Sequence, residues 1–173
     1  KILMSGLIEK PGAYRHTAVG IYKGTKVTKM APAEKMVPRL MSNLFSFLNK
    51  DKQTLELIKA CVFHYELEFI HPFMDGNGRM GRLWQQRLLM NVSPSFEYLP
   101  VETLIHKNQN KYYKALEASD IAGNSTAFVE FSLEMIWQAL NAFSSQMSTN
   151  KPKANDRIDF ALEHFGEKKF SRR

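Results

Sequence analysis

The chain has 173 residues and a formal net charge of +7, and 44% of its residues are hydrophobic. This length predicts one domain of about 150 residues plus a partial further piece, with a core that needs no disulfide. A single cysteine, no visible signal peptide and no apolar run near the ~20 residues of a membrane helix exclude a disulfide-rich secreted protein and a membrane-spanning one. We therefore expect a cytoplasmic protein. Because the sequence starts at Lys1 rather than at a methionine, we also expect an upstream region.

The first 31 residues have the weakest helical pattern of the chain. Residues 17–22 and 25–28 read as two short strands around a turn at Lys23-Gly24. An isolated hairpin is only marginally stable. We therefore expect this one to lie as a flap against a helical body.

Apolar residues spaced three and four apart predict that most of the remaining chain, up to Phe143, is helical. The expected helices cover residues 32–49, 55–69, 79–90, 101–119 and 126–143. The second of them should present a core-facing stripe made of Leu55, Ile58, Val62, Tyr65 and Phe69. Asp51 is its expected N-cap. His64 falls beside the stripe, where a buried, hydrogen-bonded structural histidine is favoured.

A loop between two of these helices gathers the chemically reactive side chains. It reads His71-Pro72-Phe73-Met74-Asp75-Gly76-Asn77-Gly78-Arg79-Met80-Gly81-Arg82. Pro72 and the Gly76-Asn77-Gly78 run break helicity, because proline lacks a donor and glycine favours positive φ. The loop therefore leads directly into the N-terminus of the following helix.

The second half of this loop is suited to binding polyanions. Successive amides of Gly76, Asn77 and Gly78, together with the positive end of the following helix, predict a phosphate site. Arg79 and Arg82 are three apart, so they lie on one helix face and can clamp the same anion.

The remaining two groups complete a reactive set. Asp75 has the wrong sign for phosphate, so we assign it to Mg²⁺ that bridges phosphate oxygens. His71 has an ordinary pKa near neutrality and can act as a base. A base, a metal ligand, an amide nest and two cations suit the transfer of a phosphorus group from a nucleotide.

The loop resembles a known family motif. It matches every fixed position of the Fic motif, H-x-F-x-[D/E]-G-N-G-R-x-x-R. The lead-in at residues 64–70 and the segments at residues 4–7 and 11–15 are also similar to Fic proteins. The resemblance implies an all-α fold, a Fic-type helical bundle with a small β-hairpin flap. It places the Fic catalytic core at residues 1–150, and residues 151–173 resemble a linker and the start of a truncated C-terminal winged-helix module.

The resemblance also implies an activity. A Fic protein of this kind is a protein adenylyltransferase, which moves AMP from ATP to a Ser, Thr or Tyr hydroxyl of a target protein bound along the residue 17–28 flap. His71 would be the general base and Asp75 would hold Mg²⁺. Phe73 would anchor the loop by packing. The phosphate-binding residues would be Gly76, Asn77, Gly78, Arg79 and Arg82.

Many Fic proteins are restrained by a helix with the pattern [S/T]-x-x-x-E-[G/N], whose glutamate pairs with the second motif arginine. Three partial matches, ending at Glu9, Glu97 and Glu130, each lack the final Gly or Asn. We therefore expect the inhibitory helix to come from the upstream region or from a separate chain, and Arg82 to be free.

Three alternatives remain open at this point. The same site can remove AMP, or can transfer other nucleotidyl or phosphoryl groups. A metal-dependent hydrolase could use His64 and His71. A DNA-binding regulator would depend mainly on the C-terminal module.

Overall fold

The computed structural model describes residues 6, 12–23, 26–99 and 101–149. Contacts divide the chain into a unit Lys1–Ala139 and a unit Leu140–Arg173. The expected domain boundary at residue 150 lies at the edge of the described residues and stays a prediction. The linker and C-terminal module expected over residues 151–173 lie outside them.

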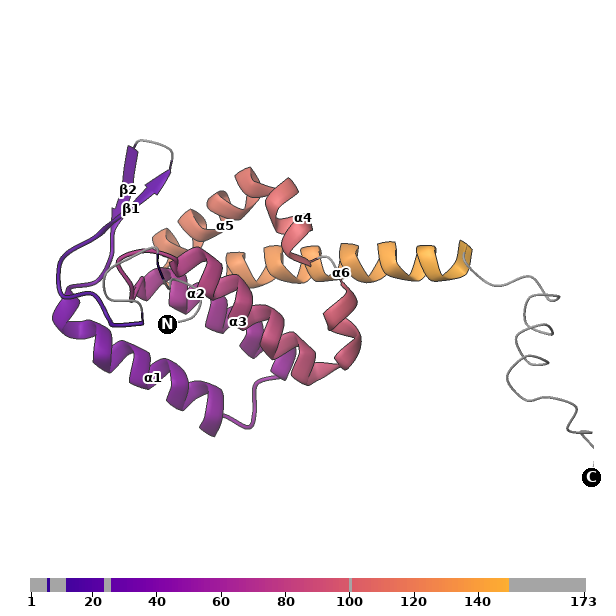
Figure 1. Ribbon diagram of the computed structural model, residues 1–173, viewed down its shortest axis with the longest axis horizontal. Coiled ribbons are helices and arrows are strands. Elements are labelled where there is room, and N and C mark those ends of the chain that lie inside the picture. Colours follow the sequence, from indigo (N-terminus) through magenta and orange to yellow (C-terminus); the bar gives the residue numbers. More distant parts are fainter. Residues whose placement is uncertain (1–5, 7–11, 24–25, 100, 150–173) are drawn as a thin grey trace, which may run out of the picture. The chain divides into compact units, whose positions relative to one another are not determined.

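The described residues are mainly helical, which confirms the all-α part of the predicted fold class (Figure 1). The helices are α1 Val37–Lys50, α2 Glu56–Ile70, α3 Asn77–Val92, α4 Val101–Lys107, α5 Gln109–Ala122 and α6 Thr126–Thr149. Two 3₁₀ helices, η2 Glu34–Met36 and η3 Pro94–Tyr98, precede α1 and follow α3. Helix α6 continues past Ala139, and it accounts for all described residues of the second unit.

Two short strands precede the helices. β1 Gly20–Lys23 pairs antiparallel with β2 Lys26–Met30, with an irregularity in register between Ile21 and Tyr22. The amide of Ala31 donates to the carbonyl of Val19 at 3.1 Å, which closes the base of the pair. These strands are drawn as the two paired arrows of Figure 1.

Helix α2 is the centre of the first unit. It packs most extensively on α3 and also on α1, and the ring of Phe128 from α6 lies 5.1 Å from the ring of His64. Because neighbours cover it on several sides, burial is not confined to one stripe. The expected stripe is wrong at its start, where Leu55 is 73% exposed. The buried α2 residues are Lys59, Ala60, Cys61, Phe63, His64, Tyr65, Leu67 and Ile70.

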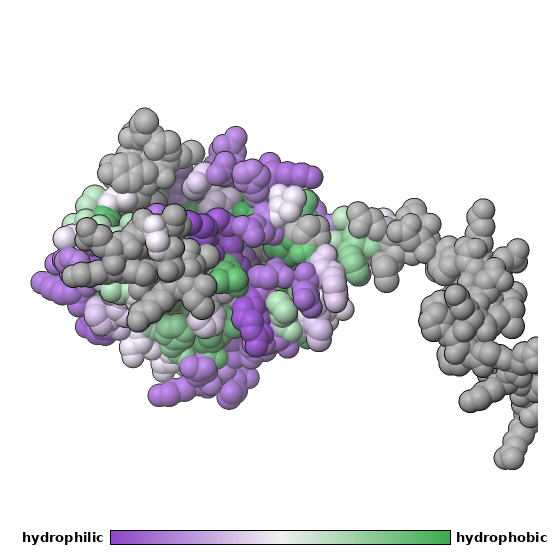
Figure 2. Space-filling model, in the orientation of Figure 1, coloured by the Kyte–Doolittle hydropathy of each residue, from purple (hydrophilic) through white to green (hydrophobic). Residues whose placement is uncertain are grey.

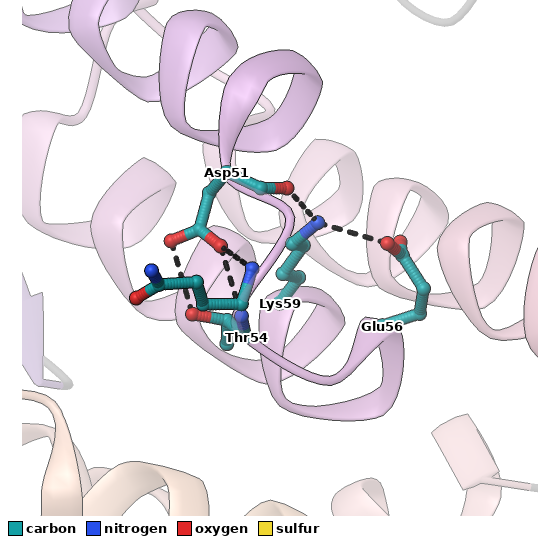
Figure 3. A network of polar contacts seen from close by, with 5 residues as sticks. Asp51, Thr54, Glu56 and Lys59 are labelled. Carbon is teal, nitrogen blue, oxygen red and sulfur yellow. Dashed lines mark hydrogen bonds and ion pairs between the residues drawn. The ribbon is translucent and has the colours of Figure 1, made fainter.

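The connection between α1 and α2 is closed by a polar network (Figure 3). One Asp51 carboxylate oxygen accepts from the amides of Gln53 and Thr54, both at 2.8 Å. These bonds lower the Asp51 pKa. The expected N-cap role of Asp51 is therefore wrong, because its carboxylate closes the preceding turn and α2 starts only at Glu56. The buried Lys59 ammonium donates to the Asp51 carbonyl at 2.5 Å and to Glu56 Oε1 at 2.8 Å.

The helix expected over residues 101–119 is broken at Asn108, between α4 and α5. The Asn108 side-chain amide donates to the carbonyl of Leu104 at 2.9 Å. Asparagine competes in this way for backbone groups and ends helices.

No helix among the described residues is both long and apolar enough to cross a membrane. Among the coloured residues of Figure 2, hydrophilic and hydrophobic side chains interleave over the visible face. Surface hydropathy therefore does not mark a ligand site on this face.

Candidate active site

A cleft of about 970 Å³ lies within the first unit. Its volume suits a ligand of nucleotide size. The root of β1, the end of α2, the loop before α3, the first turns of α3 and one face of α5 form its walls. The lining residues are Ala18, Val19, Gly20, Glu68, Phe69, His71, Met74, Asp75, Gly76, Asn77, Gly78, Arg79, Arg82, Tyr112, Tyr113, Leu116, Glu117, Asp120 and Ile121. The structure thus brings together the predicted site residues except Phe73, which does not line the cleft.

Two hydrogen bonds between Phe73 and Asn77 hold the loop in shape. The Phe73 amide donates to Asn77 Oδ1 at 2.9 Å, and Asn77 Nδ2 donates to the Phe73 carbonyl at 2.8 Å. Asn77 is only 2% exposed, so water does not compete strongly for these bonds. The Phe73 ring packs against Tyr14 at 5.9 Å between ring centroids. Phe73 is therefore an anchor of the loop, placed outside the cleft.

His71 ends α2 in a left-handed conformation, with φ 49° and ψ 59°. Among the described non-glycine residues it alone has a positive φ. Its Nδ1 lies 3.3 Å from the carbonyl oxygen of Glu68. A carbonyl can only accept, so Nδ1 carries the hydrogen and Nε2 carries the lone pair. The backbone thereby selects the tautomer whose Nε2 can take a proton.

The electrostatic surroundings of His71 keep its imidazole neutral. Burial lowers its pKa most, and the charge of Arg15 lowers it further. The hydrogen bond to Glu68 and the charge of Asp75 oppose this shift. With the pKa below its ordinary value of 6.5, the imidazole is a free base at neutral pH.

The part of the cleft wall formed by the start of α3 favours anions. Helix α3 follows Gly76, which has φ 85°, and no side chain caps its first turn. The amides of Asn77, Gly78 and Arg79 therefore lack an intrahelical acceptor. They form the positive end of the helix dipole, which favours a bound anion. The expected nest is shifted by one residue, because the Gly76 amide donates instead to Asp75 Oδ1 at 2.5 Å.

Both arginines of the loop line the cleft, and both are paired. Arg79 Nη2 lies 3.4 Å from Asp75 Oδ2. Arg82 Nε lies 3.0 Å from Oε1 of Glu102 on α4. The expectation that Arg82 is free is therefore wrong. The Glu102 side chain is 71% exposed, and ion pairs between exposed side chains are weak. A phosphate can therefore replace Glu102 as the partner of Arg82.

The described residues fit a magnesium ion only in company with a nucleotide. No cluster of three or more His, Cys, Asp or Glu side chains among them could hold a metal. Asp75 offers a single carboxylate, 63% exposed. Mg²⁺ commonly takes one or two carboxylates and completes its shell with phosphates and water. Asp75 therefore fits an ion that arrives on phosphate oxygens.

The alternative of a metal-dependent hydrolase that uses His64 is wrong. His64 is fully buried, and its Nδ1 donates to Gln85 Oε1 at 2.7 Å. Its Nε2 accepts from the Tyr112 hydroxyl at 3.3 Å. Burial lowers the His64 pKa to about 4, so it is a neutral structural histidine, as predicted.

Glu68 lines the cleft, although we had predicted no role for it in the site. Its side chain is 11% exposed, and its Oε1 lies 3.8 Å from His64 Nε2. That oxygen is buried without a hydrogen-bond partner among the described residues. Burial raises the Glu68 pKa to about 7, although the charge of Arg82 opposes the shift. Nothing in its residue type marks such a position, which arises only when α2 and α3 pack together.

Glu68→Gln is expected to stabilise the protein above neutral pH. The Glu68 pKa rises from its ordinary 4.5 to about 7 on folding. The folded state therefore favours the neutral acid, which adds to the free energy of unfolding at low pH. This contribution is lost as the pH rises from about 4.5 through about 7. The amide mimics the neutral acid, so the variant should gain about 1–2 kcal/mol at pH 8 over wild type and little at pH 4. Urea unfolding at both pH values measures this, and an equal effect at both would contradict it.

The chain matches known proteins along most of its length. The Fic/DOC family model matches residues 1–89. A probable protein adenylyltransferase of Aquifex aeolicus is 30% identical over 110 residues, which are 64% of this chain and 31% of that protein. The protein adenylyltransferase Fic of Drosophila yakuba is 37% identical over 107 residues, 60% of this chain and 20% of that protein. The chain thus spans about a third or less of these two relatives.

A solved structure extends the likeness to the whole chain. The crystal structure of a Fic family protein from Desulfovibrio desulfuricans is 41% identical and has a TM-score of 0.79. The match covers 98% of this chain and 51% of that chain. Together with the family match, which includes the whole reactive loop, this settles the affiliation: the chain belongs to the Fic/DOC family.

Proposed function

We propose that this chain is a protein adenylyltransferase that moves AMP from ATP to a Ser, Thr or Tyr hydroxyl of a target protein. One observation carries the proposal: the neutral His71, fixed as the tautomer with a free Nε2, lines the same cleft as the uncapped N-terminus of α3. A proton acceptor and a polyphosphate site thus share one cavity. The relatives named as protein adenylyltransferases support the same chemistry.

In the proposed reaction, the ATP phosphates bind at the free amides of the first turn of α3. Arg79 and Arg82 exchange their carboxylate partners for phosphate oxygens. His71 Nε2 takes the proton of the attacking hydroxyl as a bond forms to the α-phosphorus. The bond from that phosphorus to the α,β-bridging oxygen breaks, and pyrophosphate leaves against the two arginines. Magnesium held by Asp75 would offset the phosphate charge. Positioning and charge neutralisation supply most of the acceleration in such transfers.

The target segment would bind along the residue 17–28 hairpin. The described sheet has only β1 and β2, so each strand has one edge without a partner strand in the sheet. Residues 18–20, at the root of β1, line the cleft. An extended peptide could pair with the free edge of β1 through main-chain hydrogen bonds. Its hydroxyl side chain would then lie at the cleft.

The test uses ATP labelled in two positions. The protein is incubated with Mg-ATP and lysate proteins, with the label on the α-phosphate in one sample and on the γ-phosphate in the other. We expect the label that depends on the added protein to come only from the α-position, with an added AMP by mass spectrometry. Label from the γ-position that appears with the protein and is lost in His71→Asn would indicate phosphoryl transfer by this chain and would overturn the proposal. The His71→Asn variant serves as the negative control.

Asp75→Asn is expected to remove the magnesium dependence of transfer, together with most of the rate. Metal stabilisation of phosphoryl charge is worth several kcal/mol, so the rate should fall about 10²-fold or more. The measurement is the transfer rate against MgCl₂ concentration. Glu130→Gln, on an exposed position of α6, is the matched control and should behave as wild type. Full magnesium-dependent turnover by Asp75→Asn would mean that other groups hold the ion.

A further inference from the structure

Arg15 is a buried arginine whose contacts the reaction above does not use. It is 3% exposed and precedes β1. Its guanidinium donates to the carbonyls of His71 at 2.8 Å, Thr17 at 3.0 Å and Ile70 at 3.3 Å, and also to that of Pro32. Each of these acceptors is a backbone carbonyl, so the guanidinium charge is not neutralised by them.

These contacts join three separate parts of the chain. Ile70 and His71 lie at the end of α2, where helix carbonyls have no intrahelical donor. Thr17 precedes β1, and Pro32 follows β2. The backbone amide of Arg15 also donates to the carbonyl of Pro72 at 2.8 Å. One residue therefore ties both roots of the hairpin to the segment that carries the base.

The conformation of His71 requires such a support. A left-handed backbone is disfavoured for a residue with a β-carbon. Arg15 fixes the carbonyls on both sides of the His71–Pro72 peptide unit, and charge-assisted hydrogen bonds are stronger than neutral ones. The planar fork of arginine can reach several carbonyls at once, whereas a lysine ammonium is a single point. Its charge also lowers the His71 pKa, which Asp75 opposes.

We propose that Arg15 is a positioning residue that holds His71 in its proton-accepting orientation and couples the β1–β2 hairpin to it. The inference rests on the proposed function, because it assumes that His71 is the base. It goes beyond that function by assigning a role to a residue outside the reactive loop. It also predicts that a peptide bound on the hairpin is sensed at His71 through one guanidinium.

The test separates the charge of Arg15 from its geometry. Arg15→Lys keeps the charge and loses the fork, and Arg15→Gln loses both. Arg87→Gln is the matched control, because Arg87 is exposed on α3 and its side chain donates to Asn91 of the same helix. The first readout is the titration of the His71 imidazole by NMR, with the signal assigned by its loss in His71→Asn. This readout needs no activity, so it tests the effect of the Arg15 charge on His71 even if AMP transfer fails, and kcat then tests the geometry.

We expect Arg15→Gln to raise the His71 pKa, and Arg15→Lys and Arg87→Gln to leave it near the wild-type value. In transfer assays, Arg15→Lys should lower kcat about 10²-fold, because small misplacement of a reacting group has effects of this size. The KM for ATP should stay unchanged, since the first turn of α3 is untouched, while the KM for the target peptide rises. A wild-type kcat in Arg15→Lys would overturn the proposal. If Arg15→Gln does not fold, Arg15→Lys alone decides.

Discussion

Removal of the His71 imidazole is expected to lower AMP transfer by about 10²–10⁴-fold, the usual contribution of a general base. ATP affinity should change little, because the phosphate site lies on α3 and does not include the imidazole. The rate is measured with α-labelled ATP and the affinity by calorimetry. Near-normal transfer by the variant would show that His71 is not the general base.

The choice of variant matters because His71 has a positive φ. Alanine is strained in this conformation, whereas asparagine tolerates it better than most residues. His71→Asn therefore removes the base while the fold is retained, and His71→Ala reports the two effects together. Because burial lowers the His71 pKa, the wild-type rate should be flat near pH 7–8 and fall only below the ordinary histidine value of about 6.5. This acid limb should vanish in His71→Asn.

Gly81→Val is expected to destabilise the protein by about 3 kcal/mol, through overpacking. A β-carbon at Gly81 would lie 2.7 Å from Glu68 Oε1 and 2.7 Å from His64 Cδ2. The His64 ring is fully buried and both of its nitrogens are hydrogen-bonded, to Gln85 and Tyr112, so it cannot move aside. Guanidinium unfolding measures the loss. This effect opposes the general gain from replacing a helix glycine, which is roughly 1 kcal/mol for alanine.

Gly78 provides a matched comparison, one turn earlier on α3. A β-carbon there would lie 3.2 Å from Arg82 Nη1, the far end of a flexible side chain. Gly78→Ala should therefore leave stability unchanged or slightly higher, while it displaces Arg82 and weakens ATP binding. If Gly81→Ala and Gly78→Ala had equal effects on stability, the close approach of α2 and α3 would not be the reason for Gly81.

The local features of the site were predictable from the sequence, because they depend on neighbouring residues. The helix break at Pro72 and the positive φ at Gly76 are encoded within the loop, although α3 starts at Asn77, two residues before the expected start at Arg79. Asn77 bonds to Phe73, four residues away. The shift of the nest by one residue was not predictable, since it depends on the rotamer of Asp75.

Features that depend on packing between distant parts of the chain could not be predicted from the sequence. Arg15 contacts the His71 carbonyl across 56 positions of the chain, and nothing in residue type marks an arginine that binds carbonyls. The available signal was its place in the segment that resembled Fic proteins. Periodicity likewise misplaced the buried face of α2, because a helix covered on several sides has no single apolar stripe. The pairing of Arg82 with Glu102 on α4 also required the fold.

The left-handed backbone at His71 has a consequence for protein engineering. Glycine adopts this conformation without steric cost, so the fold itself would gain from losing the histidine. A library selected for thermal tolerance alone should therefore enrich glycine or asparagine at this position and return robust but inert variants. At position 71 the backbone conformation favours glycine, whereas the proposed reaction needs the imidazole. Any consensus or thermostability design on this scaffold has to hold position 71 fixed, and it has to screen for turnover in parallel.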